Sequence, residues 1–475
     1  MSESGNLKPF FEPGSIAVFG SFREGLGCYN TVKHLLHFKF SGRTYPINPS
    51  YKDVLGIKVY PDIKSVPESV DLAFILIPPH AVQEVVKECA EKGVKAFIIG
   101  SDGFAERDGQ GVRLQQELVY FARQKGIRII GPNTLGVVNT ANGLITNPYV
   151  SGEIKRGGIA IITQSGLFGS HATDFSQRSI SKICDLGNKS DIDETDVLEY
   201  LAEDKETKVI VMYLESVRDG KRFLDVSRRV AQNKPILVLK GGRTEEGARA
   251  VISHTGSLAG EDRTFDAAFK QAGVIQVEKF DQLLDFAKAL LFQPLPRGNK
   301  IATITLTGGG GIMQTDTAAK YGLSLSKLSK HTIDELTQAY PWLPINPFDL
   351  GPVIPSLRGE LSLSSIYQEI IEMILRDENV DALSVIMYAG ELKGPEFDLN
   401  IFYELQKNSF KPITVWIYGY DTPLKREWTD ILESFNIPVY LELEDAIEAL
   451  GILSKYAEIK QKLKTKQSAK SFFTN

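Results

Sequence analysis

The chain has 475 residues, of which 43% are apolar and 24% charged, and its formal net charge is −5. These values are typical of a folded protein of about three domains, and the negative balance argues against non-specific nucleic-acid binding. The first residues lack a secretory signal, no apolar run approaches the roughly 18 residues of a membrane span, and the spacing of Cys28, Cys89 and Cys184 favours a cytoplasmic location without metal-binding cysteines.

Short β-branched runs alternate with amphipathic stretches in the first third of the chain. Helical periodicity is clear over Ala81–Lys92, where apolar residues recur on one face. The strands are apolar without strict alternation, which is typical of a parallel sheet covered on both faces. We therefore predict a doubly wound α/β domain over residues 1–150. Its expected strands are Ser15–Gly20, Thr44–Asn48, Leu72–Ile77, Ala96–Ile99 and Ile127–Ile130.

The same pattern restarts twice, which predicts three consecutive doubly wound, flavodoxin-like domains. A helix over Asp281–Phe292 and a Pro/Gly linker at 293–300 divide residues 151–295 from residues 296–475. The lysine-rich end is expected to be a last helix followed by a loose tail. The expected strands are Ile159–Thr163, Lys182–Leu186, Val209–Leu214, Ile236–Leu239 and Val274–Val277, then Ile301–Leu306, Leu383–Tyr388, Ile413–Ile417 and Val439–Leu441.

Three segments look like equivalent openings of these domains: AVFGSFREGLG from Ala17, AIITQSGLFGS from Ala160 and ATITLTGGGGIM from Ala302. Each is a strand, a glycine-containing turn and a helix. In a doubly wound sheet this turn lies at the carboxyl edge, where ligands bind, and the helix start attracts anions. Each domain therefore has a candidate anion site. The four glycines at 308–311 fit a close helix–sheet contact equally well.

The first opening and the next two strand ends predict a ligand crevice. The turn from Gly20 lacks the glycine spacing of the dinucleotide fingerprint, so a purely structural turn is the alternative. Asn48-Pro49 ends the second strand and Ile77-Pro78-Pro79 follows the third. No acidic residue closes the second strand, where NAD would require one for its ribose. This disfavours a nicotinamide oxidoreductase and leaves another adenine cofactor.

The second opening predicts a phosphate site. Ser165 is not the nucleophile of a G-x-S-x-G turn, because Thr163 stands where glycine is needed. The backbone amides of Ser165, Gly166 and Leu167 are instead suited to bind a phosphate at the start of a helix.

His254 is the candidate carrier of a phosphoryl group. A lone histidine is more often structural, but its small polar and glycine neighbours cannot bury it and predict a mobile loop. A neutral imidazole can attack phosphorus, and Glu215, directly after a predicted strand, is the candidate carboxylate partner; surface placement is the alternative. The sequence has no G-x-x-x-x-G-K-[ST] motif, so we expect the nucleotide site on another polypeptide.

Together these residues resemble the nucleoside-diphosphate-forming acyl-CoA synthetases, relatives of succinyl-CoA synthetase, and in particular the separate α subunit of the ADP-forming acetyl-CoA synthetase type. The resemblance covers nearly the whole chain. It is carried by YPINPSYKDVLGIKVYPDI, GFAE, GPNTLGVVN, TQSG, GNKSDIDETDVLEYLAED, YLES, NPFDL and, most specifically, GR…SHTGSLAG.

The resemblance implies that residues 1–150 bind coenzyme A and that 151–295 form a ligase domain. It implies that His254 is phosphorylated and stabilised by Glu215, and that the helix start at 164–167 binds phosphate. A β subunit with an ATP-grasp fold would bind ADP/ATP and Mg²⁺ in an α2β2 heterotetramer. Positions implied near coenzyme A are Gly20, Ser21, Arg23, Asn48, Pro49, Lys52, Ile77, Pro78, Pro79 and Asn133; those implied near phosphate are Gln164, Ser165, Gly166 and Leu167.

The implied reaction converts acyl-CoA, phosphate and ADP reversibly into a carboxylate, CoA and ATP, with the loop of His254 swinging between two sites. Two departures from the family pattern concern the substrate pocket: Leu306-Thr307 stands where asparagine is usual before the glycines, and Asp102 where alanine is usual. They leave the acyl group open. A coenzyme A sensor of the same fold without catalytic activity is the alternative function.

Overall fold

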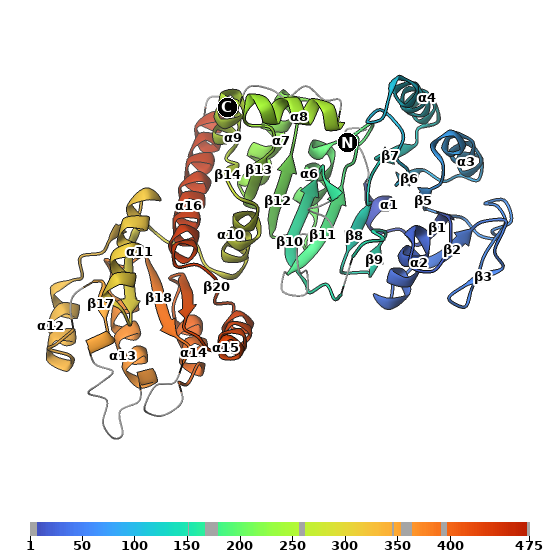
Figure 1. The fold of residues 1–475 in the computed structure, drawn as a ribbon. Coiled ribbons are helices and arrows are strands. Elements are labelled where there is room, and N and C mark those ends of the chain that lie inside the picture. The colour runs from blue at the N-terminus through green and yellow to red at the C-terminus, as the bar shows by residue number, and fades with distance from the viewer. Residues whose placement is uncertain are drawn as a thin grey trace. The chain divides into compact units, whose positions relative to one another are not determined.

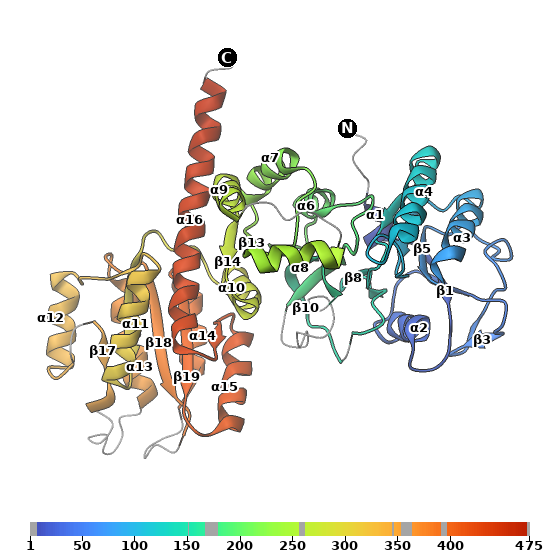
Figure 2. The same ribbon diagram turned by 45° about the horizontal axis from the view of Figure 1, so that its top comes forward.

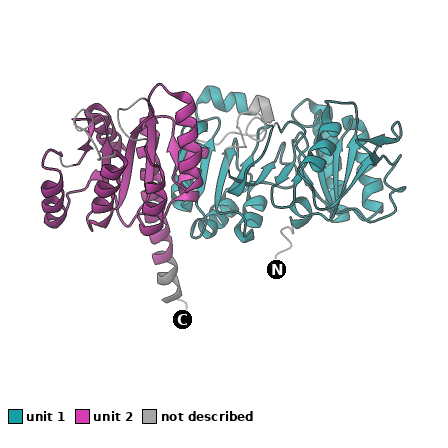
Figure 3. Ribbon diagram, turned by 90° about the horizontal axis from the view of Figure 1, so that it is seen from below, with its two compact units in different colours: residues 1–283 teal, residues 284–475 magenta. Residues whose placement is uncertain are grey.

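The structure is a computed structural model that describes residues 7–150, 152–166, 179–255, 262–343, 346–352, 363–390 and 397–472, without the side chains of 252–255, 262 and 466–472. Its ribbon is shown in Figure 1. The chain divides into two compact units, Met1–Leu283 and Leu284–Asn475, coloured in Figure 3.

The first unit contains two sheets and the helices that cover them. Its strands are β1 (Ser15–Gly20), β2 (Arg43–Ile47), β3 (Asp53–Val54), β4 (Ile57–Lys58), β5 (Leu72–Leu76), β6 (Ala96–Ile99), β7 (Arg128–Ile130), β8 (Val137–Asn139), β9 (Leu144–Ile145), β10 (Arg156–Thr163), β11 (Ile180–Asp185), β12 (Val209–Leu214), β13 (Ile236–Lys240) and β14 (Ile275–Val277). Its helices are α1 (Lys8–Phe11), α2 (Gly27–His37), α3 (Pro79–Glu91), α4 (Gly109–Lys125), α6 (Glu194–Glu203), α7 (Gly220–Ala231), α8 (Glu245–Thr255) and α9 (Asp262–Ala272), and α10 (Phe280–Phe292) contains the boundary between the units.

The first sheet is parallel, with strand order β2-β1-β5-β6-β7. Alternate strand residues such as Phe19, Ile75 and Phe97 join one core with Val86 of α3 and Leu118 of α4. This alternation follows from the period of two along a strand. The order reverses between β1 and β5, whose carboxyl ends therefore border the crevice where doubly wound sheets bind ligands.

The second sheet is parallel except at one edge. Its order is β14-β13-β12-β10-β11-β8-β9, with β8 antiparallel to β11 and β9 antiparallel to β8. The sequence predicts parallel strands only, and it assigns residues 137–145 to the first domain. The difference has a physical cause, because two- and three-residue strands are too short to show a periodic pattern.

The short helix α1 connects the two sheets of this unit. Phe10 and Phe11 are fully buried, and the ring of Phe11 stacks on that of Tyr200 with centroids 4.6 Å apart. The Asn139 side-chain amide of β8 donates to the carbonyl of Phe11 at 2.8 Å. Helix α1 is therefore part of the core of this unit.

The second unit is a single parallel sheet of order β16-β15-β18-β19-β20, with β17 also paired to β15. Its core joins the strands to α12–α15, whereas α11 and α16 pack against each other (Figure 1). Figure 2 shows α16 continuing past this sheet. The strands are β15 (Lys300–Thr305), β16 (Ser324–Leu325), β17 (Phe348–Asp349), β18 (Ala382–Tyr388), β19 (Ile413–Tyr418) and β20 (Val439–Tyr440), and the helices are α11 (Gly308–Lys320), α12 (Lys330–Ala339), α13 (Leu363–Arg376), α14 (Asn400–Asn408), α15 (Thr422–Ser434) and α16 (Leu443–Phe472).

Every strand predicted from the sequence is present, with ends shifted by a few residues. The α/β class with mainly parallel sheets is confirmed. Among the helices of the described ranges, we find none with the length and apolar character to cross a bilayer.

We expect Phe11→Ala to lower the free energy of unfolding of the first unit by about 3–5 kcal/mol, because it leaves a cavity where a fully buried ring packs. Equilibrium urea unfolding measures the loss. Tyr120→Ala is the matched control, since that ring is 68% exposed, and it should change stability by less than about 0.5 kcal/mol. Equal effects of the two substitutions would contradict the role given to α1.

Candidate functional site

The carboxyl end of β1 packs closely against α2 and β5 and is hydrogen-bonded to the residue that follows β2. A Cβ atom on Gly20 would lie 2.5 Å from Cys28 Sγ and 2.6 Å from the carbonyl oxygen of Leu76, so only glycine fits here without a shift of the backbone. The Asn48 side-chain amide donates to the carbonyl of Gly20 at 2.8 Å. The Ser21 hydroxyl lies 3.3 Å from the Tyr51 hydroxyl. The predicted residues of the first two strand ends are therefore neighbours.

Ser101 links the next three strand ends. Its hydroxyl accepts a hydrogen bond from the Ile77 N–H at 3.1 Å, after β5. Its carbonyl accepts one from the Asn133 N–H at 2.9 Å, after β7, where Asn133 has a φ of +58°. Pro78 and Asn133 are exposed at this edge. The carboxyl edge of the first sheet thus gathers the residues predicted for coenzyme A from the ends of β1, β2, β5 and β7, and Ser101 follows β6.

The crevice can attract anions. Helices α2 and α3 both begin at this edge, and neither has a side-chain cap on its first N–H groups. Such helix starts have a partial positive charge. The side chains of Arg23 and Lys52 are exposed in the turns after β1 and β2. Uncapped helix starts and two exposed cations at one sheet edge suit a ligand with several phosphates.

The carboxyl edge of the second sheet contains the predicted phosphate turn. The Thr163 hydroxyl donates to the carbonyl of Ser165 at 2.9 Å and accepts from the Ser165 N–H at 3.0 Å, which fixes the turn after β10. The Gln164 side-chain oxygen accepts from the N–H groups of Glu215 and Ser216, at 2.8 and 3.2 Å. The structure therefore brings Gln164 and Glu215 together. Leu167 lies outside the described residues.

Glu215 is held in a buried polar pocket at the end of β12, where it is only 4% exposed. The Tyr213 hydroxyl donates to its carboxylate at 3.4 Å. Burial, with the negative charge of Glu215 nearby, raises the pKa of Tyr213 to about 12, so the phenol stays a neutral donor. The Lys240 ammonium donates to the carbonyl of Glu215 at 2.8 Å and lies 4.7 Å from the centre of the Phe265 ring.

His254 lies in the last turn of helix α8, and this corrects the prediction of a loop around it. The preceding residues Glu245, Glu246, Ala248 and Arg249 are good helix formers, which outweigh Gly247. Sequence reasoning gave weight to the glycines and overlooked this run. The His254 side chain and residues 256–261 lie outside the described part of the chain, so its pairing with Glu215 stays a prediction.

Sequence reasoning missed the residues that join the two sheets of the first unit. Asp185, at the end of β11, accepts from the Leu135 N–H at 2.7 Å, and burial raises the pKa of this carboxyl to about 6. The side chain of Leu135 covers Gly166, where a Cβ would lie 2.9 Å from its Cδ1 atom. The phosphate turn is thus supported by the segment that leads from β7 of the first sheet to β8 of the second. The sequence did contain a signal for this contact, because Asp185 is an acidic residue at the end of the strand β11.

The turn after β15, in the third strand–turn–helix segment, has the same hydrogen bonds as the turn after β10. The Thr305 hydroxyl donates to the carbonyl of Thr307 at 2.8 Å and accepts from its N–H at 2.9 Å. Gly310 and Gly311 are buried, and Cβ atoms there would lie 2.9 Å from Ile386 and Pro347. A close helix–sheet contact therefore explains these two glycines.

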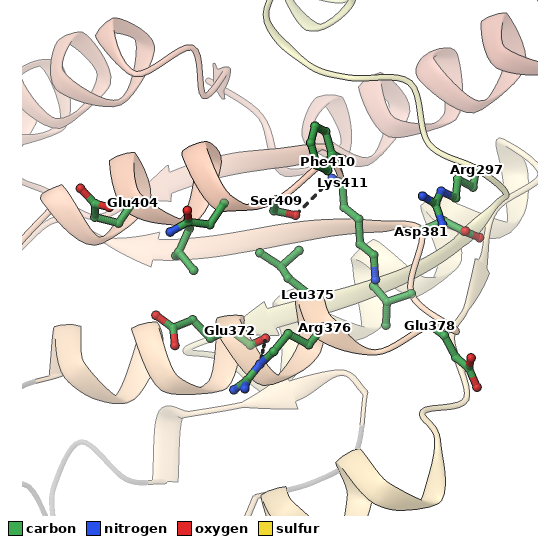
Figure 4. Close-up of a pocket in the computed structure, with 13 residues that line it drawn as sticks. Arg297, Glu372, Leu375, Arg376, Glu378, Asp381, Glu404, Ser409, Phe410 and Lys411 are labelled. Carbon is green, nitrogen blue, oxygen red and sulfur yellow. Dashed lines mark hydrogen bonds between the residues drawn. The ribbon is translucent and has the colours of Figure 1, made fainter.

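The second unit has a cavity of about 640 Å³ at the opposite edge, where β18 and β19 begin. Figure 4 shows its charged lining, including Arg297, Asp381 and Lys411. The Lys411 ammonium donates to the carbonyl of Asp377. No residue predicted for the site lines this cavity. Over the described ranges, no three His, Cys, Asp or Glu side chains gather as metal ligands would.

Two family models match the chain. The model described as a CoA binding domain matches residues 14–140, and the model described as a succinyl-CoA ligase-like flavodoxin domain matches residues 156–290. The first range contains the crevice of the first sheet. The second contains Gln164, Glu215 and His254.

Similar proteins match over almost the full length of the chain. The alpha subunit of ADP-forming acetate–CoA ligase II from Pyrococcus furiosus is 38% identical over 95% of this chain and 98% of its own. ADP-forming acetate–CoA ligase II from Archaeoglobus fulgidus is also 38% identical, over 95% of this chain and 67% of its own.

Among solved structures, the dinucleotide-forming acetyl-coenzyme A synthetase 1 of Candidatus Korarchaeum cryptofilum, in complex with phosphate and ADP, superposes with a TM-score of 0.87. It is 32% identical, and the match covers 97% of this chain and 99% of that one. The identity, the coverage and the two domain models agree with the resemblance drawn from the motifs. The chain is therefore a ligase that belongs to the family of ADP-forming acetate–CoA ligase alpha subunits.

Proposed function

We propose that the chain interconverts acyl-CoA and a carboxylate through an acyl phosphate and a phosphorylated His254. A phosphate oxygen attacks the thioester carbon, the C–S bond breaks, and CoA leaves as the thiol with the proton that phosphate gives up. A ring nitrogen of His254 then attacks phosphorus, and the P–O bond to the acyl group breaks to release the carboxylate. ADP finally takes the phosphoryl group to form ATP.

The observation that carries this proposal is the buried Glu215 carboxylate beside the turn at 164–166. Its N–H is fixed by Gln164 at 2.8 Å, so the side chain starts from a defined place at the sheet edge. A carboxylate there can bind the second ring nitrogen of a phosphorylated histidine and offset its positive charge. The amides of Ser165 and Gly166 are the candidate phosphate ligands in the same turn.

The crevice of the first sheet is the proposed site for coenzyme A. The close packing at Gly20 fixes the end of β1 against β5, and the helix starts of α2 and α3 with Arg23 and Lys52 would neutralise the phosphates of the coenzyme. The bound coenzyme supplies the thiol that forms and releases the thioester. The acyl group is left open, because Asp102 at this edge departs from the family pattern.

The nucleotide site is proposed to lie on a partner. The Pyrococcus relative is named a subunit alpha, and this chain spans 67% of the single-chain Archaeoglobus relative. We assign the remaining third to a β subunit with an ATP-grasp fold that binds ADP/ATP and Mg²⁺, in an α2β2 assembly. Mg²⁺ would neutralise the phosphates during transfer.

We expect incubation with [³²P]-labelled ATP and the partner subunit, or with acetyl-CoA and labelled phosphate, to place an acid-labile label on this chain. His254→Ala should abolish it, because no other group would accept the phosphoryl. His331→Ala is the control, since that side chain is 82% exposed on α12, and it should keep the label. Labelling that survives in His254→Ala would overturn the mechanism.

We expect Gly20→Ala to weaken binding of coenzyme A by at least about tenfold, since the added Cβ has to displace Cys28 or the β5 backbone at the crevice. Isothermal titration with coenzyme A measures the effect. Gly109→Ala serves as the control because nothing lies within 4 Å of its Cβ position. Unchanged affinity in Gly20→Ala would place the coenzyme elsewhere.

A further inference from the structure

Lys189 and Glu194 form a buried ion pair next to the end of β12. The Lys189 ammonium lies 2.9 Å from a carboxylate oxygen of Glu194, and the two side chains are only 5% and 0% exposed. The same ammonium donates to the carbonyl of Ser216 at 2.9 Å and approaches its hydroxyl at 3.3 Å. The other Glu194 oxygen accepts from the Arg218 N–H at 3.1 Å. The pair therefore binds both residues that flank Val217.

This arrangement is unfavourable for stability taken alone. Removing two charges from water costs free energy that their attraction seldom recovers, so apolar residues are often at least as stable at such places. Lys189 also has a φ of +51°, in the left-handed region that residues other than glycine and asparagine rarely adopt. Lys189 thus combines an unfavourable backbone conformation with a buried charge. Such a combination indicates a functional role in addition to packing.

The contacts show what the pair holds in place. Ser216 directly follows Glu215, and its N–H is bound by Gln164 at 3.2 Å on one side. Lys189 binds the carbonyl and hydroxyl of the same residue on the other side. Ser216 is thus fixed at both its N–H and its C=O group, by the side chains of Gln164 and Lys189, which come from two different turns. This fixes the backbone from which the Glu215 carboxylate extends.

We propose that Lys189 and Glu194 are positioning residues that fix Glu215 for phosphoryl transfer. The inference rests on the proposed function, which supplies the role of Glu215. Neither residue is assigned contact with substrate. Their effect passes through Ser216, so their loss should slow formation of phosphohistidine and leave coenzyme A binding, on the first sheet, unchanged.

The test uses the full-length double variant Lys189→Met/Glu194→Gln, which removes both charges together and keeps similar side-chain volumes. Its matched control is Lys182→Met/Asp204→Asn, because that ion pair is equally buried, at 3% and 9% exposure, with its atoms 2.8 Å apart. Lys182 belongs to β11 of the same sheet, and Asp204 follows α6. Neither touches the Glu215–Arg218 segment in the contacts described above. Labelling from acetyl-CoA and [³²P]phosphate, and titration with coenzyme A, are measured for each.

We expect the Lys189/Glu194 variant to label about 10- to 100-fold more slowly than the wild type, as misplacement of a reacting group by about 1 Å can do, with unchanged affinity for coenzyme A. The control should label at the wild-type rate. Wild-type labelling rates in the Lys189/Glu194 variant would overturn the inference, and so would equal slowing in the control. Absence of label on the wild-type chain, both from acetyl-CoA with phosphate and from ATP with the partner subunit, would instead overturn the proposed function.

A second variant covers the case in which the double substitution prevents folding and coenzyme A no longer binds. Ser216→Ala keeps the ion pair and removes only the hydroxyl contact with Lys189. It should slow labelling about threefold, which is within the range for loss of one ordinary hydrogen bond. Labelling of Ser216→Ala at the wild-type rate would then count against the positioning role.

Discussion

The site depends on one constraint: the backbone N–H and C=O groups of Glu215 and Ser216, at the end of β12, are all held by hydrogen bonds with side chains. Gln164 accepts both N–H groups of this segment. Lys240 and Lys189 donate to its two carbonyls. Buried backbone groups at a strand end have lost their ladder partners and require replacements. Here the side chains of Gln164 and Lys189, from two turns, and of Lys240, at the end of β13, supply them, so the position of Glu215 depends on the whole carboxyl edge.

This constraint explains why the edge is polar while the sheets behind it are apolar. The strand residues of β10–β13 are mostly buried, and polar groups appear where each strand ends. Parallel strands place all these ends on one side. The hydrogen bonds of Thr163 with Ser165 recur between Thr305 and Thr307 in the second unit. The same local solution therefore starts a helix in both sheets, which supports the equivalence of the openings inferred from the sequence.

Sequence reasoning located the strands well because strands buried on both faces are unbroken β-branched runs. Asn48, Ile77 and Gln164 were found for the same reason, since they directly follow such runs. β8 and β9 were missed because strands this short have no measurable period. Lys189 was missed because its partner Ser216 is distant in sequence, and a lysine in a polar segment looks like a solvent-exposed residue. Contacts between loops, unlike strand ends, are not encoded by local pattern.

The position of His254 in a helix, and not in the predicted loop, affects how a phosphoryl carrier can move. A helix of eleven residues is marginally stable in water by itself, so α8 depends on packing against the rest of the unit. Among the side chains described for 245–251, only Val251 is buried; it packs on Gly242, where a Cβ would lie 2.8 Å from Val251 Cγ2. The proposed transfer between separated sites therefore has to move the last turn of a helix rather than a loop alone, and with the helix at least the contact of Val251.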